Sequence, residues 1–189
     1  NEYINSIIRT TRELSHMTGN ILSLSRLENQ TIITDQEAFH VDEQIRQCIL
    51  LRETIWSEKN LVIDPDLDSI IWKGNRELTS HIWNNLLDNA IKFTPAGGLV
   101  NIRVSEKPCN REGFTTFEFR IKDNRIGMSE KFQAHVFDPF SREQTSTQSG
   151  VKGTGLGMAI TRNIVDMMGG TIFLTSKEGK GTEFVVTLN

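Results

Sequence analysis

Three glycines lie at the start of a predicted helix, in the stretch GVKGTGLGMAI, residues 150–160. Gly153, Gly155 and Gly157 alternate with Thr154 and Leu156, although each glycine weakens regular structure. Either the stretch is a tight structural corner, or its backbone must lie close to a ligand that leaves no room for side chains. Glycines before a helix present N–H groups and the positive end of the helix dipole, so the second interpretation predicts a phosphate.

The two familiar nucleotide-binding loops do not match this stretch. A P-loop continues with Lys and Ser or Thr, but here Met158 and Ala159 follow the last glycine. A dinucleotide-binding loop reads G-x-G-x-x-G directly after a strand, whereas this one reads G-x-G-x-G after a polar stretch. Both motifs are excluded, while the argument for anion binding remains.

The polar stretch itself, residues 141–152, is rich in Ser, Thr and Gln. One interpretation is a disordered surface loop. The other is a mobile lid over a ligand, with Arg142 and Lys152 as candidate phosphate partners. Both interpretations imply mobility, so composition does not decide between them.

A second candidate site lies in NNLLDNAIKFT, residues 84–94. Asn85, Asn89 and Lys92 are spaced i, i+4 and i+7, so on a helix they form one polar stripe. This stripe is either a solvated helix edge or a wall of a nucleotide site. In a nucleotide site an amide oxygen would coordinate Mg²⁺ and the lysine ammonium would contact phosphate.

Composition limits the class of protein that carries these residues. The chain has 189 residues, 37% hydrophobic and 24% charged, as expected for one soluble domain with an appended element. Its net charge of −3 gives no electrostatic footprint for nucleic acid. We expect no signal peptide before the fold, and no apolar run approaches the roughly 20 residues of a membrane span. Cys48 and Cys109 have no metal-ligand spacing and suggest no secreted disulfide framework, so we expect a cytoplasmic protein.

The first thirty residues predict one long helix. Ile7, Leu14 and Ile21 recur every seven residues within 3–28, which is typical of a seam in a helical bundle or coiled coil. Its partner helices must come from missing sequence or from a second chain. Because the chain begins at Asn1 and has only one such helix, we expect a fragment of a longer protein.

Past a linker at 31–37, periodicity predicts the helices that frame the candidate site. Asp42 is expected to cap a helix, and a second helix is expected at about 75–93. Short strands are predicted between them at LVID and SIIW. The helix that Asp42 is expected to cap is predicted to bury one face, which consists of Ile45, Cys48, Ile49, Ile55 and Trp56.

The later strands indicate the fold class, because apolar residues alternate with polar ones. The alternating positions are Val100, Ile102 and Val104; Phe117, Phe119 and Ile121; Ile172 and Leu174; and Phe184, Val186 and Leu188. Such alternation means that one face of the sheet is buried and the other is wet. We therefore predict a two-layer α/β sandwich, with helices on one face of a mixed, largely antiparallel sheet.

Five motifs occur in order along the chain: NNLLDNAIKFT (84–94), DNRIGM (123–128), VFDPFSRE (136–143), KGTGLGM (152–158) and GKGTEFVVTL (179–188). With these N, G1, F, G2 and G3 boxes, residues 38–189 resemble the catalytic, ATP-binding domain of bacterial sensor histidine kinases, which have the Bergerat fold. Residues 1–30 resemble the second helix of the family's dimerisation and phosphotransfer hairpin, with the first helix missing.

The resemblance implies a role for each matching residue. Asn89 would bind Mg²⁺ through its amide oxygen, with Asn85 supporting it from one turn earlier. Lys92 would contact phosphate, Phe93 would lie beside the nucleotide, and Asp123 would accept a hydrogen bond from the adenine amino group.

The same resemblance implies the rest of the ATP site. The glycines of the G2 box would close over the phosphates, Gly179 and Gly181 would shape the adenine pocket, and Phe137 would anchor the lid with Phe140. The remaining residues implied to bind ATP are Gly127, Met128, Phe140, Arg142, Lys152, Gly153, Thr154, Gly155, Leu156, Gly157 and Thr182.

The implied function is transfer of the γ-phosphate of ATP to a histidine in two-component signalling, with ATP and Mg²⁺ as cofactors. The implied partners are the dimerisation domain that carries the acceptor histidine, a response regulator receiver domain, and a second copy in the intact homodimer. No nucleic acid is implied, and a membrane anchor would lie only in upstream sequence. Asn85 stands where gyrase-type and chaperone relatives carry glutamate. An amide cannot take a proton from water, which favours transfer over hydrolysis.

The chain departs from the family pattern at two places. Arg125 occupies the middle glycine position of the D-x-G-x-G box. It either points to solvent with little effect, or crowds the pocket and leaves a degenerate module that acts through partners. The acceptor histidine is also missing. His16 lacks an acidic neighbour and a following Thr-Pro and lies on the wrong helix, so we expect no self-phosphorylation. The other histidines are expected to be structural or surface residues: His40, His81 and His135.

Overall fold

The structure, a computed structural model, describes residues 35–108, 115–124, 126–143 and 153–189, together with residues 3, 4, 11, 18 and 19. Most of the helix predicted at 3–28 lies outside the described residues. So do the greater part of the predicted lid and the individual residues His16, Cys109, Arg125 and Lys152. Among the described helices, none combines the length and the hydrophobicity that crossing a membrane requires.

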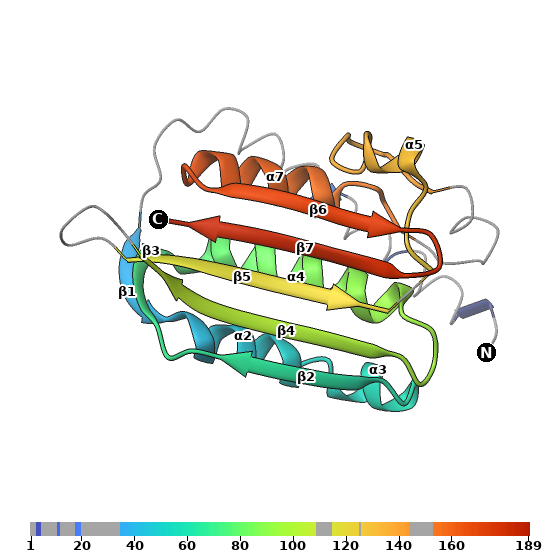
Figure 1. The fold of residues 1–189 in the computed structure, drawn as a ribbon, viewed down its shortest axis with the longest axis horizontal. Helices are drawn as coiled ribbons and strands as arrows, with labels where there is room; N and C mark the ends of the chain where they lie inside the picture. Colours follow the sequence, from blue (N-terminus) through green and yellow to red (C-terminus); the bar gives the residue numbers. More distant parts are fainter. Residues whose placement is uncertain are drawn as a thin grey trace.

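A five-stranded sheet forms one layer of the domain, and helices cover one of its faces (Figure 1). β2 pairs with β4 in parallel, and the remaining neighbours pair antiparallel. The predicted two-layer sandwich with a mixed, largely antiparallel sheet is therefore confirmed. In spatial order the strands are β2 (Val62–Leu67), β4 (Leu99–Lys107), β5 (Thr116–Asp123), β7 (Gly181–Leu188) and β6 (Thr171–Lys177).

The predicted alternation sets the register of the central strands. Ile102 lies opposite Ile121 and Val104 lies opposite Phe119, and all four side chains are buried. Arg103, between two of these positions, is exposed on the other face. Because a shift of one residue would turn every apolar side chain to solvent, burial on one face fixes this pairing.

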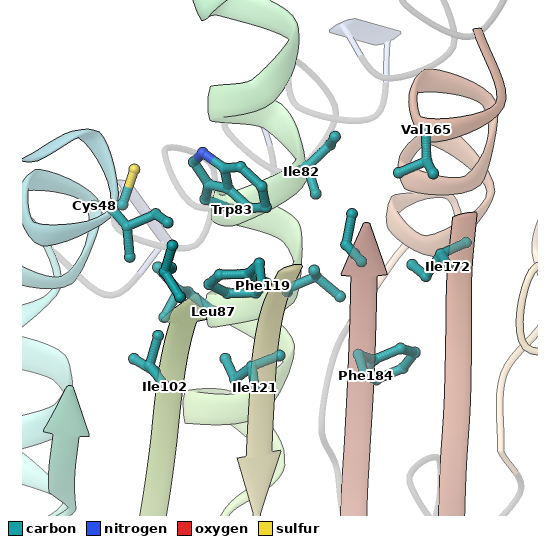
Figure 2. Packing of buried hydrophobic residues seen from close by; sticks show 14 of the residues in the cluster. Cys48, Ile82, Trp83, Leu87, Ile102, Phe119, Ile121, Val165, Ile172 and Phe184 are labelled. Atoms are coloured by element: carbon teal, nitrogen blue, oxygen red, sulfur yellow. The ribbon is translucent and has the colours of Figure 1, made fainter. Parts of the chain in front are cut away.

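Helices α2 (Val41–Leu50), α4 (Arg76–Phe93) and α7 (Gly157–Met167) form the second layer, behind the sheet in Figure 1. Figure 2 shows side chains of α4 pointing into the sheet between α2 and α7. Trp83 is fully buried, and its ring lies 4.7 Å from that of Phe119 between centroids. This helix is therefore held firmly at the centre of the core.

A buried polar network fixes α2 against α4. The indole nitrogen of Trp83 donates to Oε1 of Gln44 over 2.8 Å, and the Thr79 hydroxyl donates to the same oxygen over 3.0 Å. Gln44 in turn donates its amide nitrogen to the carbonyl of Arg76 over 2.7 Å. Because each buried group has a partner, this network specifies one arrangement of the two helices.

Two predictions for the first of these helices are wrong. Its N-cap is His40, whereas Asp42 lies in the first turn and accepts a hydrogen bond from the amide of Ile70. The helix also ends at Leu50. The chain then turns and enters the short α3 (Glu53–Glu58), so Ile55 points outward with 53% of its surface exposed. Cys48 is buried as predicted.

A two-stranded ribbon of β1 (Gln36–His40) and β3 (Ile71–Asn75) leads into α4. Pairing begins at Gln36, two residues before the expected domain start at 38. Asn75 caps α4 by accepting the amide of Leu78 over 2.8 Å, which agrees with the predicted helix of about 75–93.

Candidate functional site

The polar stripe of α4 faces the first turn of α7. Asn85 donates its amide nitrogen to the carbonyl of Gly157 over 3.1 Å and to the hydroxyl of Thr161 over 3.2 Å. Its amide oxygen accepts no hydrogen bond from the described part of the chain. A Cβ on Gly157 would lie 3.5 Å from that oxygen. The structure thus brings together the two segments that sequence analysis selected independently.

Asn89 lies one turn after Asn85, half-buried. Its side chain makes no hydrogen bond with any residue that the structure describes, so its amide oxygen can accept a ligand. The described residues contain no group of three His, Cys, Asp or Glu side chains that could hold a metal. A cation here would fit Mg²⁺, which commonly takes one protein oxygen and completes its shell with phosphates and water.

Positive groups gather beyond Asn89, at the end of α4. The Lys92 ammonium lies 5.1 Å from the centre of the Phe93 ring, and a Cβ on Gly153 would come within 2.8 Å of it. Burial lowers the pKa of Lys92, the nearby charge of Arg142 lowers it further, and Asp88 raises it. An anion bound between Lys92 and Arg142 would offset both the lost hydration of the Lys92 ammonium and the repulsion between the two positive charges.

The glycine loop also serves the fold. Gly155 has φ of +72°, and a Cβ there would lie 2.7 Å from the carbonyl carbon of Phe140. The Phe140 amide donates to the Gly155 carbonyl over 2.9 Å. Gly155 is therefore the tight corner of the first interpretation. Gly153 and Gly157 border the polar stripe of α4, and the phosphate of the second interpretation stays a prediction.

Helix α7 begins directly after this loop. Leu156 precedes it with a fully buried side chain, and no described side chain caps its N-terminus. The Leu156 amide donates to the Thr154 hydroxyl over 3.3 Å, which orders the approach to the helix. The first-turn amides of a helix have no partner within the helix, so this end offers donors and a positive dipole to an anion.

A buried carboxylate lies where β5 ends. Asp123 is 4% exposed, and its Oδ1 accepts the amide of Thr182 over 3.2 Å. Gly181 has φ of +96°, and a Cβ there would overlap the carbonyl of Asp123. A Cβ on Gly127, at φ of +77°, would overlap the carbonyl of Lys177. These two glycines let the loop after β5 and the β6–β7 hairpin close around the carboxylate.

The start of the predicted lid is fixed by α5 (Glu130–Gln133) and its flanks. The Ser129 hydroxyl donates to Glu143 over 2.9 Å, and the Phe137 ring packs edge-on against Phe184 at 6.5 Å. Phe140 is 62% exposed, and its backbone amide donates to the carbonyl of Gly155.

Residues 74–189 match the model of a family described as histidine kinase-, DNA gyrase B- and HSP90-like ATPases. This match spans more than half of the chain. The chain belongs to this ATPase family.

The curated relatives of this chain are much longer than the chain itself. The heme sensor protein HssS of Staphylococcus saprophyticus is 31% identical over 186 residues, which cover 98% of this chain and 38% of that protein. HssS of Staphylococcus aureus strain JH9 is 33% identical over 187 residues, with 99% and 39% covered. The chain therefore spans less than half the length of these relatives.

Solved structures share the fold of this ATPase-family chain. Full-length ShkA in complex with AMPPNP gives a TM-score of 0.81 at 22% identity, covering 99% of this chain and 38% of that one. The histidine kinase AdeS of Acinetobacter baumannii gives 0.78 at 23% identity, with 98% and 83% covered. ThkA in complex with the response regulator TrrA gives 0.74 at 22% identity, with 100% and 50% covered.

Ser176 lies beside the candidate site and is not among the residues that the sequence singles out. The Ser176 hydroxyl accepts the amide of Met128 over 2.9 Å and donates to the carbonyl of Gly181 over 3.0 Å. It also lies 2.8 Å from the hydroxyl of Thr182. Because the single Ser176 proton goes to a carbonyl, Thr182 is the donor of that contact. One feature of the sequence could have pointed to Ser176. It follows Ile172 by four positions on the same strand, on the inward-facing side, where the alternation predicts an apolar residue.

Proposed function

We propose that this chain is the ATP-binding catalytic domain of a sensor histidine kinase, which transfers the γ-phosphate of ATP to a histidine on a dimerisation domain. The observation that supports this most is the hydrogen bond from Asn85 to the Gly157 carbonyl, 3.1 Å long. It joins the helix that carries Asn89 and Lys92 to the loop that opens α7.

The adenine end of the proposed site centres on Asp123. A buried carboxylate is an acceptor, so it would take a hydrogen bond from the exocyclic amino group of adenine. Thr182 holds this carboxylate through its amide, and Gly127 and Gly181 allow the backbone of the loop after β5 and of the β6–β7 hairpin to pack closely around it. The base would thus be recognised by a group that the sheet itself holds in place.

The phosphate end centres on Lys92 and the start of α7. Lys92 and Arg142 would attract the phosphates, and the first-turn amides of α7 would donate to their oxygens. Asn89 would hold Mg²⁺ through its amide oxygen, and this ion would neutralise phosphate charge and orient the γ-phosphate. Phe93 and Gly153 border the same space around the Lys92 ammonium.

Transfer to a protein histidine suits this site better than hydrolysis. Asn85 has its amide nitrogen committed to α7 and has no group that can take a proton from water. The domain would therefore hold ATP until an acceptor arrives. The proposed partners are the dimerisation domain, a second copy in a homodimer, and a response regulator. The complex of ThkA with TrrA supports the last of these. We propose that the domain acts in the cytoplasm of a bacterial sensor.

The test is a titration with the non-hydrolysable analogue AMPPNP, with and without Mg²⁺, followed by addition of a separate hairpin domain that carries a histidine. We expect saturable binding that Mg²⁺ strengthens, and acid-labile phosphohistidine on the hairpin when ATP replaces the analogue. The chain alone should acquire no such label. Absence of nucleotide binding would contradict the proposal.

The second candidate is a degenerate module that binds partners without catalysis, and Arg125 favours it. An arginine in place of glycine adds a Cβ and bulk beside the proposed adenine pocket. The titration should be repeated with Arg125→Gly. The kinase proposal expects affinities within about threefold of each other, since ordinary surface substitutions change little. A gain from undetectable to measurable binding would favour the module.

A further inference from the structure

Lys59 lies at the C-terminal end of α3, remote in sequence from every motif of the ATP site. Its ammonium donates to the carbonyls of Ile91 and Thr94 over 2.6 Å each and to that of Lys92 over 3.1 Å. Its own carbonyl accepts the amide of Gly97 over 3.0 Å. One lysine therefore holds the end of α4 and the turn that follows it.

The end of a helix needs such a partner. The last carbonyl groups of an α-helix receive no hydrogen bond from an N–H group of the same helix, and they form the negative end of its dipole. At the end of α4 the carbonyl of Ala90 is satisfied by the amide and hydroxyl of Thr94, at 3.0 and 2.6 Å. Lys59 satisfies the carbonyls of Ile91 and Lys92, which follow.

The negative end of α4 coincides with the proposed phosphate site, because Lys92 and Phe93 form its last turn. A polyanion placed there would be repelled by an uncovered helix C-terminus. The Lys59 ammonium is partly withdrawn from water where it meets these carbonyls, and this burial lowers its pKa. A charge in this setting is screened less than one on an open surface.

We propose that Lys59 is a positioning residue for the triphosphate: it fixes the turn that carries Lys92 and offsets the negative end of α4. The inference rests on the proposed function. Lys59 would act without touching the nucleotide, and its effect should fall on the phosphates rather than on the base. A residue that only stabilised the fold would affect ATP and adenosine equally.

The experiment measures Mg-ATP and adenosine affinities for the whole chain and its Lys59→Met and Lys59→Arg variants. We expect Lys59→Met to weaken ATP about two- to fivefold, the size of a helix-dipole interaction, with adenosine changed less. Lys59→Arg keeps the positive charge and the hydrogen-bond donors, so its ATP affinity should match that of the unchanged chain. The matched control is Lys73→Met, because Lys73 is exposed on β3. In Figure 1, β3 lies at one end of the domain, and the start of β4, which follows the turn that Lys59 holds, lies at the opposite end.

Two further measurements separate positioning from folding. Lys59→Gln removes the charge but keeps a donor, so it replaces Lys59→Met if the latter unfolds at the assay temperature, and it should show the same selective loss. In a Lys92→Met background, Lys59→Met should change the ratio of the ATP and adenosine affinities less than it does in the unchanged chain, because only the effect on the negative end of α4 remains.

The outcomes are distinct. An unchanged ATP-to-adenosine ratio in Lys59→Met or Lys59→Gln, with wild-type binding intact, overturns the role of Lys59 and leaves the ATP site standing. A full effect of Lys59→Met in the Lys92→Met background also overturns it. Failure of the wild-type chain to bind ATP removes both the proposed function and this inference.

Discussion

Asn85 donates its side-chain amide to the carbonyl of Gly157, a residue 72 positions later in the chain. This bond ties the middle of α4 to the first residue of α7, the two helices whose ends frame the proposed phosphate site. The bond uses the amide nitrogen of Asn85 and leaves its amide oxygen beside the first residue of α7, 3.5 Å from the position that a Cβ on Gly157 would take.

Asn85→Ala should destabilise the domain and weaken ATP binding together. The substitution removes two hydrogen bonds to α7 and should lower the free energy of unfolding by about 1–2 kcal/mol, measured in urea. Asn84→Ala is the matched control. Among the described residues, the Asn84 side chain forms a hydrogen bond only with Ser80 on its own helix, and its loss should cost below about 0.5 kcal/mol. Equal costs for the two variants would show that the contact with α7 is unimportant.

Asp123→Asn should weaken ATP binding about 10- to 100-fold, because a hydrogen bond to a charged acceptor is replaced by one to an amide. The new amide can also donate to the 6-oxo group of ITP, so the preference for ATP over ITP should narrow. Calorimetric titrations with both nucleotides measure this. Asp64→Asn, on the edge strand β2, should leave both affinities unchanged. An unaltered ATP-to-ITP preference in Asp123→Asn would argue against this carboxylate as the base contact.

ATP affinity should fall as the pH rises through the lowered pKa of Lys92. The bound phosphates favour the protonated ammonium, so affinity is complete below that pKa and declines above it. Burial and Arg142 lower this pKa from the ordinary 10.5, so the decline begins earlier than for an exposed lysine. Lys92→Arg keeps its charge throughout and should abolish this part of the decline. A profile unchanged by that substitution would refute the assignment.

Gly181→Ala should be far more costly than Gly179→Ala. Both glycines have positive φ, but only at Gly181 would a Cβ overlap backbone, namely the carbonyl of Asp123. We expect losses of about 3 kcal/mol or more and about 1 kcal/mol, respectively, in thermal or urea unfolding. The surviving Gly181→Ala protein should also bind adenosine poorly. Similar losses at both sites would mean that the hairpin does not close on Asp123 as described.

Much of the fold could be predicted from local patterns. The alternation around Ile102 and Ile121 fixed which face of the sheet is buried, and Asn75 marked the start of α4. Ile55 was placed wrongly because an apolar spacing continues across the turn between α2 and α3, where the helical phase is lost. Asp42 was misassigned because its carboxylate binds Ile70, which only the tertiary fold brings near.

The candidate site was predictable where residue types are unusual, and less so where they are ordinary. Asparagines and glycines at strained or helical positions stand out, which is how Asn85 and Gly157 were found. Ser176 and Lys59 are common residues in unremarkable surroundings, and their roles depend on contacts with the hairpin and with the end of α4. The expected role of Phe140 as an anchor of the lid stays a prediction, and the structure adds a backbone bond between Phe140 and Gly155.

The most direct test of the central claim is a crystal structure of this chain with AMPPNP and Mg²⁺. We expect the adenine amino group against Asp123, Mg²⁺ on the amide oxygen of Asn89, and the phosphates between Lys92 and the first turn of α7. A nucleotide bound elsewhere, or a site that stays closed at saturating nucleotide, would contradict it.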